Sequence, residues 1–557
     1  MKVVIIGGVA AGATTAARLR RLNKDVEIIM FEKGNYVSYA NCGLPYYVSG
    51  EIREKSDLLL MTPELFKERF QVDVRVGSEV KAIDPDNQTV AVYNHITEKT
   101  YQESYDQLVI ATGSAPIRLP IPGIDHPDIQ QLWTIEDFVK IRQMVELKNI
   151  QTACIIGGGF VGIETAENLR ELKVDVDVVE KGAQILNNLD FEMVQPIHKY
   201  LNKKGVHLYL NTELMAFEDD HSRIQVKTDA FTKSYDLVIL SVGVKPQSEL
   251  AKQAGIACNQ RGGIIVDEHL MTNIPHIYAV GDVIEVEHYI NHQKTMIPLA
   301  GPANKEGRIL ANHLMGANES YQGSLGSSII KVFKMAAAST GFNEKQLQAQ
   351  GLKRHQDYEV IIIQQKSHAG YYPGATPLTM KVIYDLQQKI LGAQVVGYEG
   401  VDKRIDVIST AIHYHGKVTD LKDYEIVVFC GGVYASGISY KKFLNKNYNK
   451  IKDKEIILFF NGASPFDEAT LKNTIKNNFI SELTTKPIYY GRARWNLDKM
   501  SFIDKTLCKM LIKMVSKKES KDLQPWKQAL MEVNGKNCDW TDEKYIVPLI
   551  DYVLKIN

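Results

Sequence analysis

The chain opens on the stretch Lys2-Val3-Val4-Ile5-Ile6-Gly7-Gly8-Val9-Ala10-Ala11-Gly12, which decides its fold. It predicts an apolar strand over residues 2–6, a glycine turn over 7–12 and a helix of small residues from Ala13. A second strand over 26–31 follows and ends on Glu32. Strand, glycine turn, helix and strand with a terminal acid together predict a dinucleotide-binding unit.

The same order returns about 150 residues later. A strand over 153–156 leads into Gly157-Gly158-Gly159-Phe160-Val161-Gly162, then a helix over 163–172 and a strand over 176–179 that ends on Glu180. Glycines let the backbone approach a pyrophosphate at the positive end of the helix, and the acid accepts ribose hydroxyls. Val9 replaces the middle glycine of the first turn, so we expect a looser or shifted phosphate contact there.

Two such units predict two dinucleotides, a tightly held flavin and a visiting nicotinamide. Residues 105–113 (YDQLVIATG) and 278–282 (YAVGD) resemble signature elements of the FAD domain in two-dinucleotide flavoproteins, and residues 235–246 (YDLVILSVGVKP) resemble the element that closes the nicotinamide domain. Glu180 favours NADH over NADPH because a carboxylate repels a 2′-phosphate, which Lys181 partly offsets.

These segments predict an α/β fold with two Rossmann-like dinucleotide-binding domains, an α+β interface domain and a partial flavodoxin-like tail. The expected boundaries are 1–120 with 250–326 for FAD, 121–249 for NAD(P), 327–425 for dimerisation and 426–557 for the tail. The expected cofactor-binding residues are Gly7, Gly8, Val9, Ala10, Ala11, Gly12, Glu32, Lys33, Ala111, Thr112, Gly113, Gly157, Gly159, Phe160, Val161, Gly162, Glu164, Glu180, Gly243, Gly281, Asp282 and Ala300.

Composition excludes several other classes. The chain is 45% hydrophobic and 24% charged, and its apolar runs are far shorter than the roughly 20 residues of a membrane span. The first apolar run stops in glycines without a cleavage site, so we expect a cytoplasmic protein without membrane or nucleic-acid partners. The six cysteines include no CxxC pair, which argues against a metal site and a disulfide framework.

Cys42 stands apart from the other cysteines. It lies in Ser38-Tyr39-Ala40-Asn41-Cys42-Gly43-Leu44-Pro45, a polar setting that predicts the start of a helix. A thiol at a helix N-terminus is expected to have a lowered pKa. Since no other cysteine lies four or five residues away, the thiol is expected to cycle as a mixed disulfide, a persulfide or a sulfenic acid.

The segments SYANCGLPYY, GGVAAG and HAGYYPG (residues 368–374) make the resemblance specific. Residues 1 to about 425 resemble the single-cysteine branch of the pyridine nucleotide–disulfide oxidoreductases, most of all coenzyme A disulfide reductases. The resemblance implies a homodimer in which Cys42 is the redox centre and Tyr371 or Tyr372 serves the partner's site. It also implies coenzyme A contacts at Thr14, Arg18, Arg21, Ser38, Asn41 and Asn304.

Other reactions stay open on the same residues. Coenzyme A persulfide or polysulfide reduction would use the same thiolate and arginines. An NADH oxidase or peroxidase would use a sulfenic acid, but those enzymes typically carry a histidine where this chain has Ala10 and Ala11. An oxidase with a protective Cys42, or a non-enzymatic electron-transfer protein, are the alternatives from other classes.

The resemblance to the reductases ends near Glu425. Their YAPP-containing stretch is missing, and the chain continues as Ile426-Val427-Val428-Phe429-Cys430-Gly431-Gly432. Residues 426–557 carry 22 Lys and Arg against 14 Asp and Glu, and they resemble the later part of a flavodoxin-domain protein. Its strands are expected at 426–437 and 455–465, with a further matching segment at 500–514. Because the phosphate-binding loop of a flavodoxin lies before these strands, we do not expect the tail to bind FMN.

Overall fold

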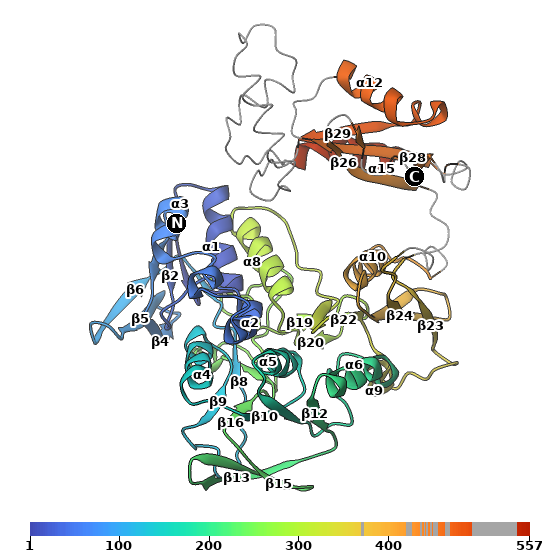
Figure 1. The fold of residues 1–557 in the computed structure, drawn as a ribbon. Helices are drawn as coiled ribbons and strands as arrows, with labels where there is room; N and C mark the ends of the chain where they lie inside the picture. Colours follow the sequence, from blue (N-terminus) through green and yellow to red (C-terminus); the bar gives the residue numbers. More distant parts are fainter. Residues whose placement is uncertain are drawn as a thin grey trace, which may run out of the picture. The chain divides into compact units, whose positions relative to one another are not determined.

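The computed structural model describes residues 1–368, 373–418, 426–434, 437–438, 441, 444–445, 448, 455–462, 468–492 and 543–556. The chain forms two compact units, residues 1–418 and residues 419–557 (Figure 1). Each unit has its own sheets and its own buried core.

The first glycine turn lies at the centre of a parallel sheet. Its strand order is β18 (Ile277–Ala279), β7 (Gln107–Ile110), β1 (Lys2–Ile6), β2 (Glu27–Phe31) and β3 (Asp73–Arg75). The buried, apolar β1 pairs with both β2 and β7, so the strand order reverses beside it. Helices α1 (Ala10–Leu22) and α8 (Ala300–Leu314) pack side by side (Figure 1). Ligands of such folds bind at this reversal point.

The second glycine turn lies in an equivalent sheet. Its parallel order is β12 (Val206–Tyr209), β11 (Asp175–Val179), β10 (Thr152–Ile156), β16 (Leu237–Leu240) and β9 (Ile129–Gln131). Its helices are α4 (Ile135–Leu147), α5 (Phe160–Glu171) and α6 (Phe191–Lys203). Two antiparallel three-stranded sheets accompany these parallel sheets. One consists of β4 (Ser78–Asp84), β5 (Thr89–Asn94) and β6 (Lys99–Ser104), and the other of β13 (Leu214–Asp220), β14 (Arg223–Thr228) and β15 (Thr232–Tyr235).

The third five-stranded sheet, called the third sheet below, is antiparallel. Its order is β21 (Ser328–Val332), β22 (Met335–Gly341), β25 (Ile390–Gly397), β24 (Pro377–Asp385) and β23 (Tyr358–Lys366). Helix α10 (Val401–His413) packs on β22 and β25, and α9 (Glu344–Ala349) precedes β23. Shorter elements of the first unit are α2 (Leu44–Ser49), α3 (Pro63–Phe70), α7 (Glu249–Gln253), β8 (Ser114–Pro116), β17 (Val244–Pro246), β19 (Val286–Glu287) and β20 (Lys294–Thr295).

The second unit contains a four-stranded sheet in the order β27 (Gly437–Ile438), β26 (Ile426–Tyr434), β28 (Glu455–Gly462) and β29 (Ile488–Arg492). Strands β26, β28 and β29 are parallel, which confirms both strands expected in this region. Helices α12 (Glu468–Asn478) and α15 (Val547–Ile556) complete the described part, and the segment expected at 500–514 lies outside it. Buried Ile456, Leu458 and Phe460 form the centre of its core.

Both glycine turns are tighter than the sequence predicts. A Cβ on Gly12 would lie 1.9 Å from the carbonyl oxygen of Gly7, and one on Gly162 would lie 2.2 Å from that of Gly157. Helices α1 and α5 therefore begin at Ala10 and Phe160, three residues before the expected starts. The absence of side chains lets the first helical turn fold directly over the strand end.

A buried lysine on β24 joins the start of α6 to the third sheet. The fully buried Lys381 of β24 lies 2.6 Å from Asp190 and 2.5 Å from Glu344, and it also pairs with Glu192. These three carboxylates are close enough together to resemble a metal site, but the ammonium group of Lys381 lies against all three. They hold the pKa of Lys381 above its usual range against the opposing effect of burial.

We expect Lys381→Met to lower the free energy of unfolding by about 3–5 kcal/mol, because it leaves buried carboxylates without a counter-charge. Lys227→Met removes the exposed pair with Glu218 and should cost less than about 1 kcal/mol. Urea unfolding followed by circular dichroism compares the two variants. The loss of unfolding free energy caused by Lys381→Met should shrink as the pH falls, because the carboxylates take up protons. Equal losses in both variants would show that the buried ion pairs of Lys381 do not stabilise the fold.

Candidate active site

The two acids at the strand ends are held in the same way. The Glu32 carboxylate accepts N–H bonds from Gly8 at 3.0 Å and from Gly34 at 2.8 Å. Glu180 accepts from the equivalent glycines, Gly158 and Gly182, each at 2.8 Å. Because each carboxylate oxygen accepts only one of these bonds, lone pairs are left for the two hydroxyls of a ribose.

The helix N-termini beside these acids are chemically suited to phosphate. Helices α1, α5 and α8 begin after Val9, Gly159 and Leu299, without a side-chain cap and without an acid in the first turn. Their first N–H groups are therefore available to an anion. A Cβ on Gly159 would meet open space, whereas Val9 fills the equivalent position with its side chain, which agrees with the expected difference between the turns.

Two expected flavin contacts, Lys33 and Thr112, bind a residue that the sequence did not single out, Gln247. Its amide donates to the carbonyl oxygens of Thr112 and Ser114, at 3.0 Å and 2.9 Å, and its side-chain oxygen accepts from Lys33 at 2.7 Å. The sequence offers only one indication of this role, which is the position of Gln247 directly after the segment 235–246. Gln247 therefore fixes the turn that contains three expected contacts: Ala111, Thr112 and Gly113.

Seven expected contacts lie at strand ends and helix starts. Gly113, Gly243 and Gly281 have φ values of 66°, 101° and 84°, which favour glycine. Ser114 donates to Asp282 at 3.0 Å, while burial raises the pKa of Asp282. Ala300 is the first residue of α8. Val161 lies in the first turn of α5 beside the half-buried Phe160, which packs against the core.

Cys42 lies at the start of α2, in a short 3-10 turn over Asn41–Gly43. The residue is exposed, and α2 packs against α4 and α5. The pKa of the thiol is raised, first because protein atoms displace water around it and second because of the Glu164 carboxylate. The expectation of a lowered pKa is therefore wrong here: the six residues of α2 provide a weak dipole that does not outweigh these two effects.

Glu164 of α5 is the acid beside this thiol. It is half-buried, and burial, followed by the charge of Glu167, raises its pKa to about 7. Both protonation states are therefore populated near neutral pH. The sequence indicates Glu164 only as a nicotinamide contact, and its effect on Cys42 follows from the packing of α2 on α5.

The residues expected to bind coenzyme A fall into three places. Thr14 donates to Asn304 at 2.7 Å across the α1–α8 contact, and Arg18 donates to Asn312 of α8 at 2.8 Å. Arg21 instead lies over the Phe70 ring, 5.2 Å from its centroid. Ser38 has a φ of 46° and donates its N–H to the carbonyl of Gly8, while Asn41 is exposed beside Cys42. Tyr371 and Tyr372 lie outside the described residues.

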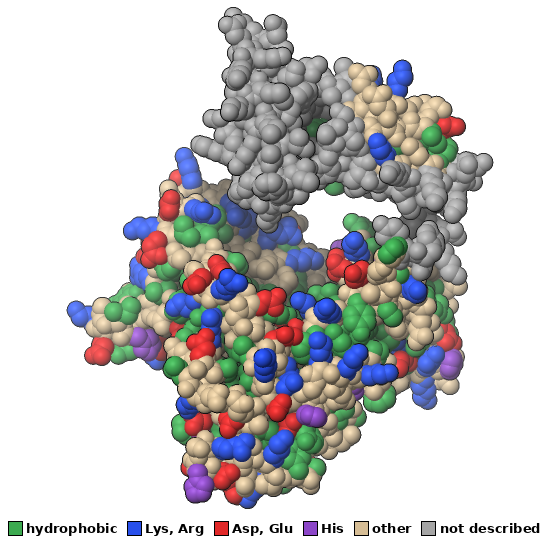
Figure 2. All heavy atoms as spheres, viewed as in Figure 1, with side chains coloured by type: hydrophobic (Ala, Val, Ile, Leu, Met, Phe, Trp, Pro, Cys, Tyr) green, Lys and Arg blue, Asp and Glu red, His purple; other side chains and the backbone are tan. Residues whose placement is uncertain are grey.

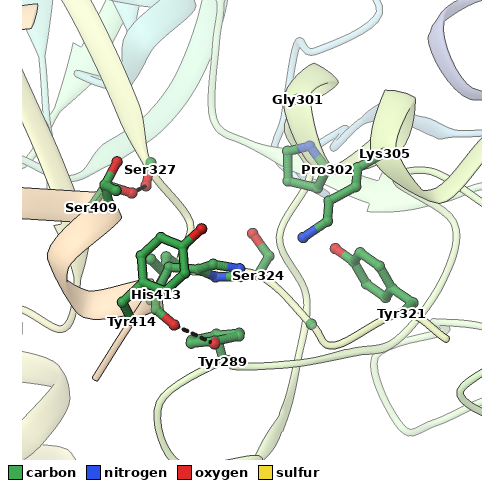
Figure 3. A pocket seen from close by; sticks show the side chains of 13 residues that line it. Tyr289, Gly301, Pro302, Lys305, Tyr321, Ser324, Ser327, Ser409, His413 and Tyr414 are labelled. Carbon is green, nitrogen blue, oxygen red and sulfur yellow. Dashed lines mark hydrogen bonds between the residues drawn. The ribbon is translucent and has the colours of Figure 1, made fainter. Parts of the chain in front are cut away.

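A cavity of about 480 Å³ lies between α8 and α10. Figure 3 shows Lys305 and Tyr321 on one side of it and Tyr289, His413 and Tyr414 on the other, with the Tyr289 hydroxyl donating to the His413 carbonyl at 2.8 Å. Burial, followed by the charge of Arg308, lowers the pKa of Lys305. None of the expected site residues lines this cavity, so it is separate from the predicted substrate contacts.

Charged side chains of both signs are intermixed over the visible face of residues 1–418 (Figure 2). Among the residues that the structure describes, no helix has the length and apolar character needed to cross a membrane.

Comparison with known families agrees with this geometry. Residues 1–307 match the pyridine nucleotide-disulphide oxidoreductase family, residues 327–426 match its dimerisation domain, and residues 399–522 match the flavodoxin domain. The chain belongs to the pyridine nucleotide-disulphide oxidoreductase family, and it is an oxidoreductase with a flavodoxin-like tail.

Several proteins named as reductases of coenzyme A disulfide or persulfide are similar to most of this chain. The coenzyme A disulfide reductase of Staphylococcus epidermidis is 35% identical over 446 residues, which cover 80% of this chain and 98% of that protein. The reduced CoADR-RHD protein of Bacillus anthracis has a TM-score of 0.74 at 35% identity, covering 88% of this chain and 96% of its own. An NAD-dependent persulfide reductase from A. fulgidus has a TM-score of 0.72 at 29% identity, covering 88% and 98%.

We expect Glu164→Gln to lower the pKa of Cys42, because the substitution removes the carboxylate charge and keeps the side-chain size. Alkylation by iodoacetamide, read by mass spectrometry, should become about threefold faster or more at pH 8 and change less at pH 6, where Glu164 is largely protonated. Glu171→Gln, at the exposed end of α5, is the control and should not change the rate. An unchanged rate in Glu164→Gln would show that its charge does not reach the thiol.

Proposed function

We propose that the chain is an FAD-dependent NAD(P)H:disulfide oxidoreductase that reduces coenzyme A disulfide through Cys42. The observation that carries the proposal is the exposed Cys42 in the turn directly before α2. Helix α2 packs against α5, which carries Glu164 with a pKa raised to about 7. Cys42, Cys154 and Cys258 are free among the described residues, which supports a disulfide from the substrate as the reaction partner of Cys42. The name of the Staphylococcus epidermidis relative supplies the identity of that disulfide.

The cofactor assignment follows from the two sheets. Residues 1–120 and 250–326 would bind FAD, since β1 and β18 from these segments share one sheet. Residues 121–249 would bind the nicotinamide through Gly157, Gly159 and Gly162. Two features support the binding of both dinucleotides: the uncapped N-termini of α1 and α5, and the two carboxylates held by backbone N–H groups.

NADH is the favoured reductant. The Glu180 carboxylate is fixed where the ribose hydroxyls of a nicotinamide dinucleotide bind in this fold. Lys181, the residue that could offset its charge, pairs with Glu213 at 2.6 Å instead. The repulsion of a 2′-phosphate is therefore not neutralised locally.

In this reaction a bound FAD would supply the path for an electron pair from the nicotinamide to the sulfur of Cys42. Cys42 attacks the coenzyme A disulfide, releases one coenzyme A thiol and retains the other as a mixed disulfide. Arg18, near the Thr14–Asn304 contact, and Arg21 would bind the phosphates of coenzyme A. The dimerisation domain supports a homodimer as the working unit.

The persulfide of coenzyme A is a second candidate substrate, because the same thiol and arginines would serve and the A. fulgidus neighbour carries that activity in its name. In that reaction Cys42 takes up the outer sulfur as a persulfide. The two substrates give different products, coenzyme A thiol alone or coenzyme A thiol with hydrogen sulfide.

We expect Cys42→Ser to abolish reduction of coenzyme A disulfide while NADH still bleaches the flavin, because the serine removes the sulfur and leaves both dinucleotide sites intact. NADH consumption and free-thiol release are measured side by side, with oxygen consumption recorded. Cys258→Ser, a half-buried thiol, is the control and should retain activity. Oxygen consumption unaffected by Cys42→Ser, with no disulfide reduction by the parent protein, would identify an oxidase instead.

We expect Glu180→Ala to raise the kcat/KM ratio of NADPH to NADH by about tenfold or more, because loss of the carboxylate removes both the ribose hydrogen bonds and the repulsion of the 2′-phosphate. Steady-state kinetics with both nucleotides measures the ratio. Glu32→Ala is the counterpart in the other unit: it should weaken flavin retention and leave the ratio unchanged. A ratio unaffected by Glu180→Ala would remove the basis for the NADH preference.

A further inference from the structure

A cleft of about 340 Å³ opens beside the C-terminal half of α5. It is lined by the end of α2, by α5, by Lys331 of β21, and by Phe333 and Lys334 in the turn between β21 and β22. Glu51, Glu167 and Glu171 supply acids, and Lys204 supplies a further ammonium group. None of the residues expected from the sequence to bind a cofactor or substrate lines this cleft.

Glu167 is the unusual member of this lining. It is 5% exposed, and the backbone N–H of Phe333 donates to its carboxylate. Its Oε2 atom has no hydrogen-bond partner among the described residues. A buried carboxylate oxygen without a protein partner requires a water molecule or a proton. Since Glu167 lines the cleft, water in the cleft is the available partner.

Charges of both signs face Glu167. Burial raises its pKa, and so do the carboxylates of Glu171 and Glu51, while the Phe333 N–H and Lys331 oppose the rise. Lys204 and Lys334 add positive charge at the same cleft.

Glu167 is also connected to the thiol. It follows Glu164 by three residues on α5, which places both side chains on one helix face. Its charge contributes to the raised pKa of Glu164, and Glu164 in turn acts on Cys42. Tyr46, one turn after Cys42 on α2, has its pKa raised by burial and by both glutamates. Glu164 and Glu167 on α5 and Tyr46 on α2 therefore lie on the two helices that pack against each other beside Cys42.

We propose that Glu167 and Glu164 form a proton relay that carries protons from water in the cleft to the site around Cys42, with Tyr46 beside the route. The inference rests on the proposed disulfide reduction. Cleavage of one S–S bond to two thiols needs two electrons and two protons. NADH provides the electron pair with one proton, so each turnover takes one further proton from solvent.

In the relay, a proton from water adds to the Glu167 carboxylate, passes to Glu164 and then to a thiolate sulfur, and each carboxyl returns to its starting state. Glu167 acts through Glu164 and does not touch the reacting sulfur, so it is a positioning residue for the proton. Its loss should leave substrate binding intact and slow only the step that consumes the proton.

The test compares the complete, flavin-loaded proteins carrying Glu167→Gln or Glu167→Asp with a control, Glu68→Gln, which changes an exposed acid of α3 that does not line the cleft. Glu167→Gln should lower kcat for coenzyme A disulfide about tenfold at pH 8, leave KM unchanged and increase the solvent deuterium isotope effect on kcat. Glu167→Asp should recover part of the rate, and Glu68→Gln should match the parent. Unchanged kcat and isotope effect in Glu167→Gln would overturn the relay.

A second readout needs no substrate. Loss of the Glu167 charge should shift the Glu164 ionisation to lower pH, so the Glu164 carboxylate should oppose formation of the Cys42 thiolate from a lower pH onward. Alkylation of Cys42 by iodoacetamide should therefore be slower just below pH 7 in Glu167→Gln, and it should not change in Glu68→Gln. An unchanged alkylation rate in Glu167→Gln would overturn the coupling. If the parent protein does not reduce coenzyme A disulfide at all, the proposed function fails, and this alkylation rate alone then decides for or against the relay.

Discussion

The contact between the backbone at Gly12 and the carbonyl oxygen of Gly7 is the constraint on which the rest of the structure depends. It leaves no space for a side chain, and it brings the start of α1 directly over the end of β1. The first amides of the helix are then uncapped, and the Gly8 N–H reaches the carboxylate of Glu32. The parallel sheet that contains β10 repeats this arrangement from Gly157 to Glu180, so one local geometry builds both dinucleotide sites.

The electrostatics around Cys42 depend on how α5 packs against α2. Helix α5 provides Glu164, whose carboxylate opposes thiolate formation, and Glu167, whose charge acts on Glu164. A site that stores protons beside a redox thiol suits a reaction in which thiolates must be protonated to leave. Lys381 in turn holds the start of α6 against the third sheet through its buried ion pairs.

Several features could be predicted because they are local in sequence. The strand β1, the glycine turns, the acids Glu32 and Glu180, and the parallel strands β26 and β28 of the tail follow from periodicity and from residue types at fixed spacing. The helix starts were placed three residues late, because turn length depends on backbone contacts that spacing does not reveal. The pKa of Cys42 was predicted in the wrong direction, because desolvation and the Glu164 charge come from a helix more than 100 residues away.

The sequence by itself determined that this chain folds around two phosphate-binding turns, and that Cys42 has no nearby partner cysteine, since both are properties of consecutive residues. Only the tertiary structure decided which groups meet: Thr14 with Asn304, Gln247 with the turn at Thr112, and Glu164 with Cys42. These pairs are separated by more than 100 residues along the chain. Their proximity depends on packing between sheets and helices, and local pattern carries no information about the resulting burial and charge.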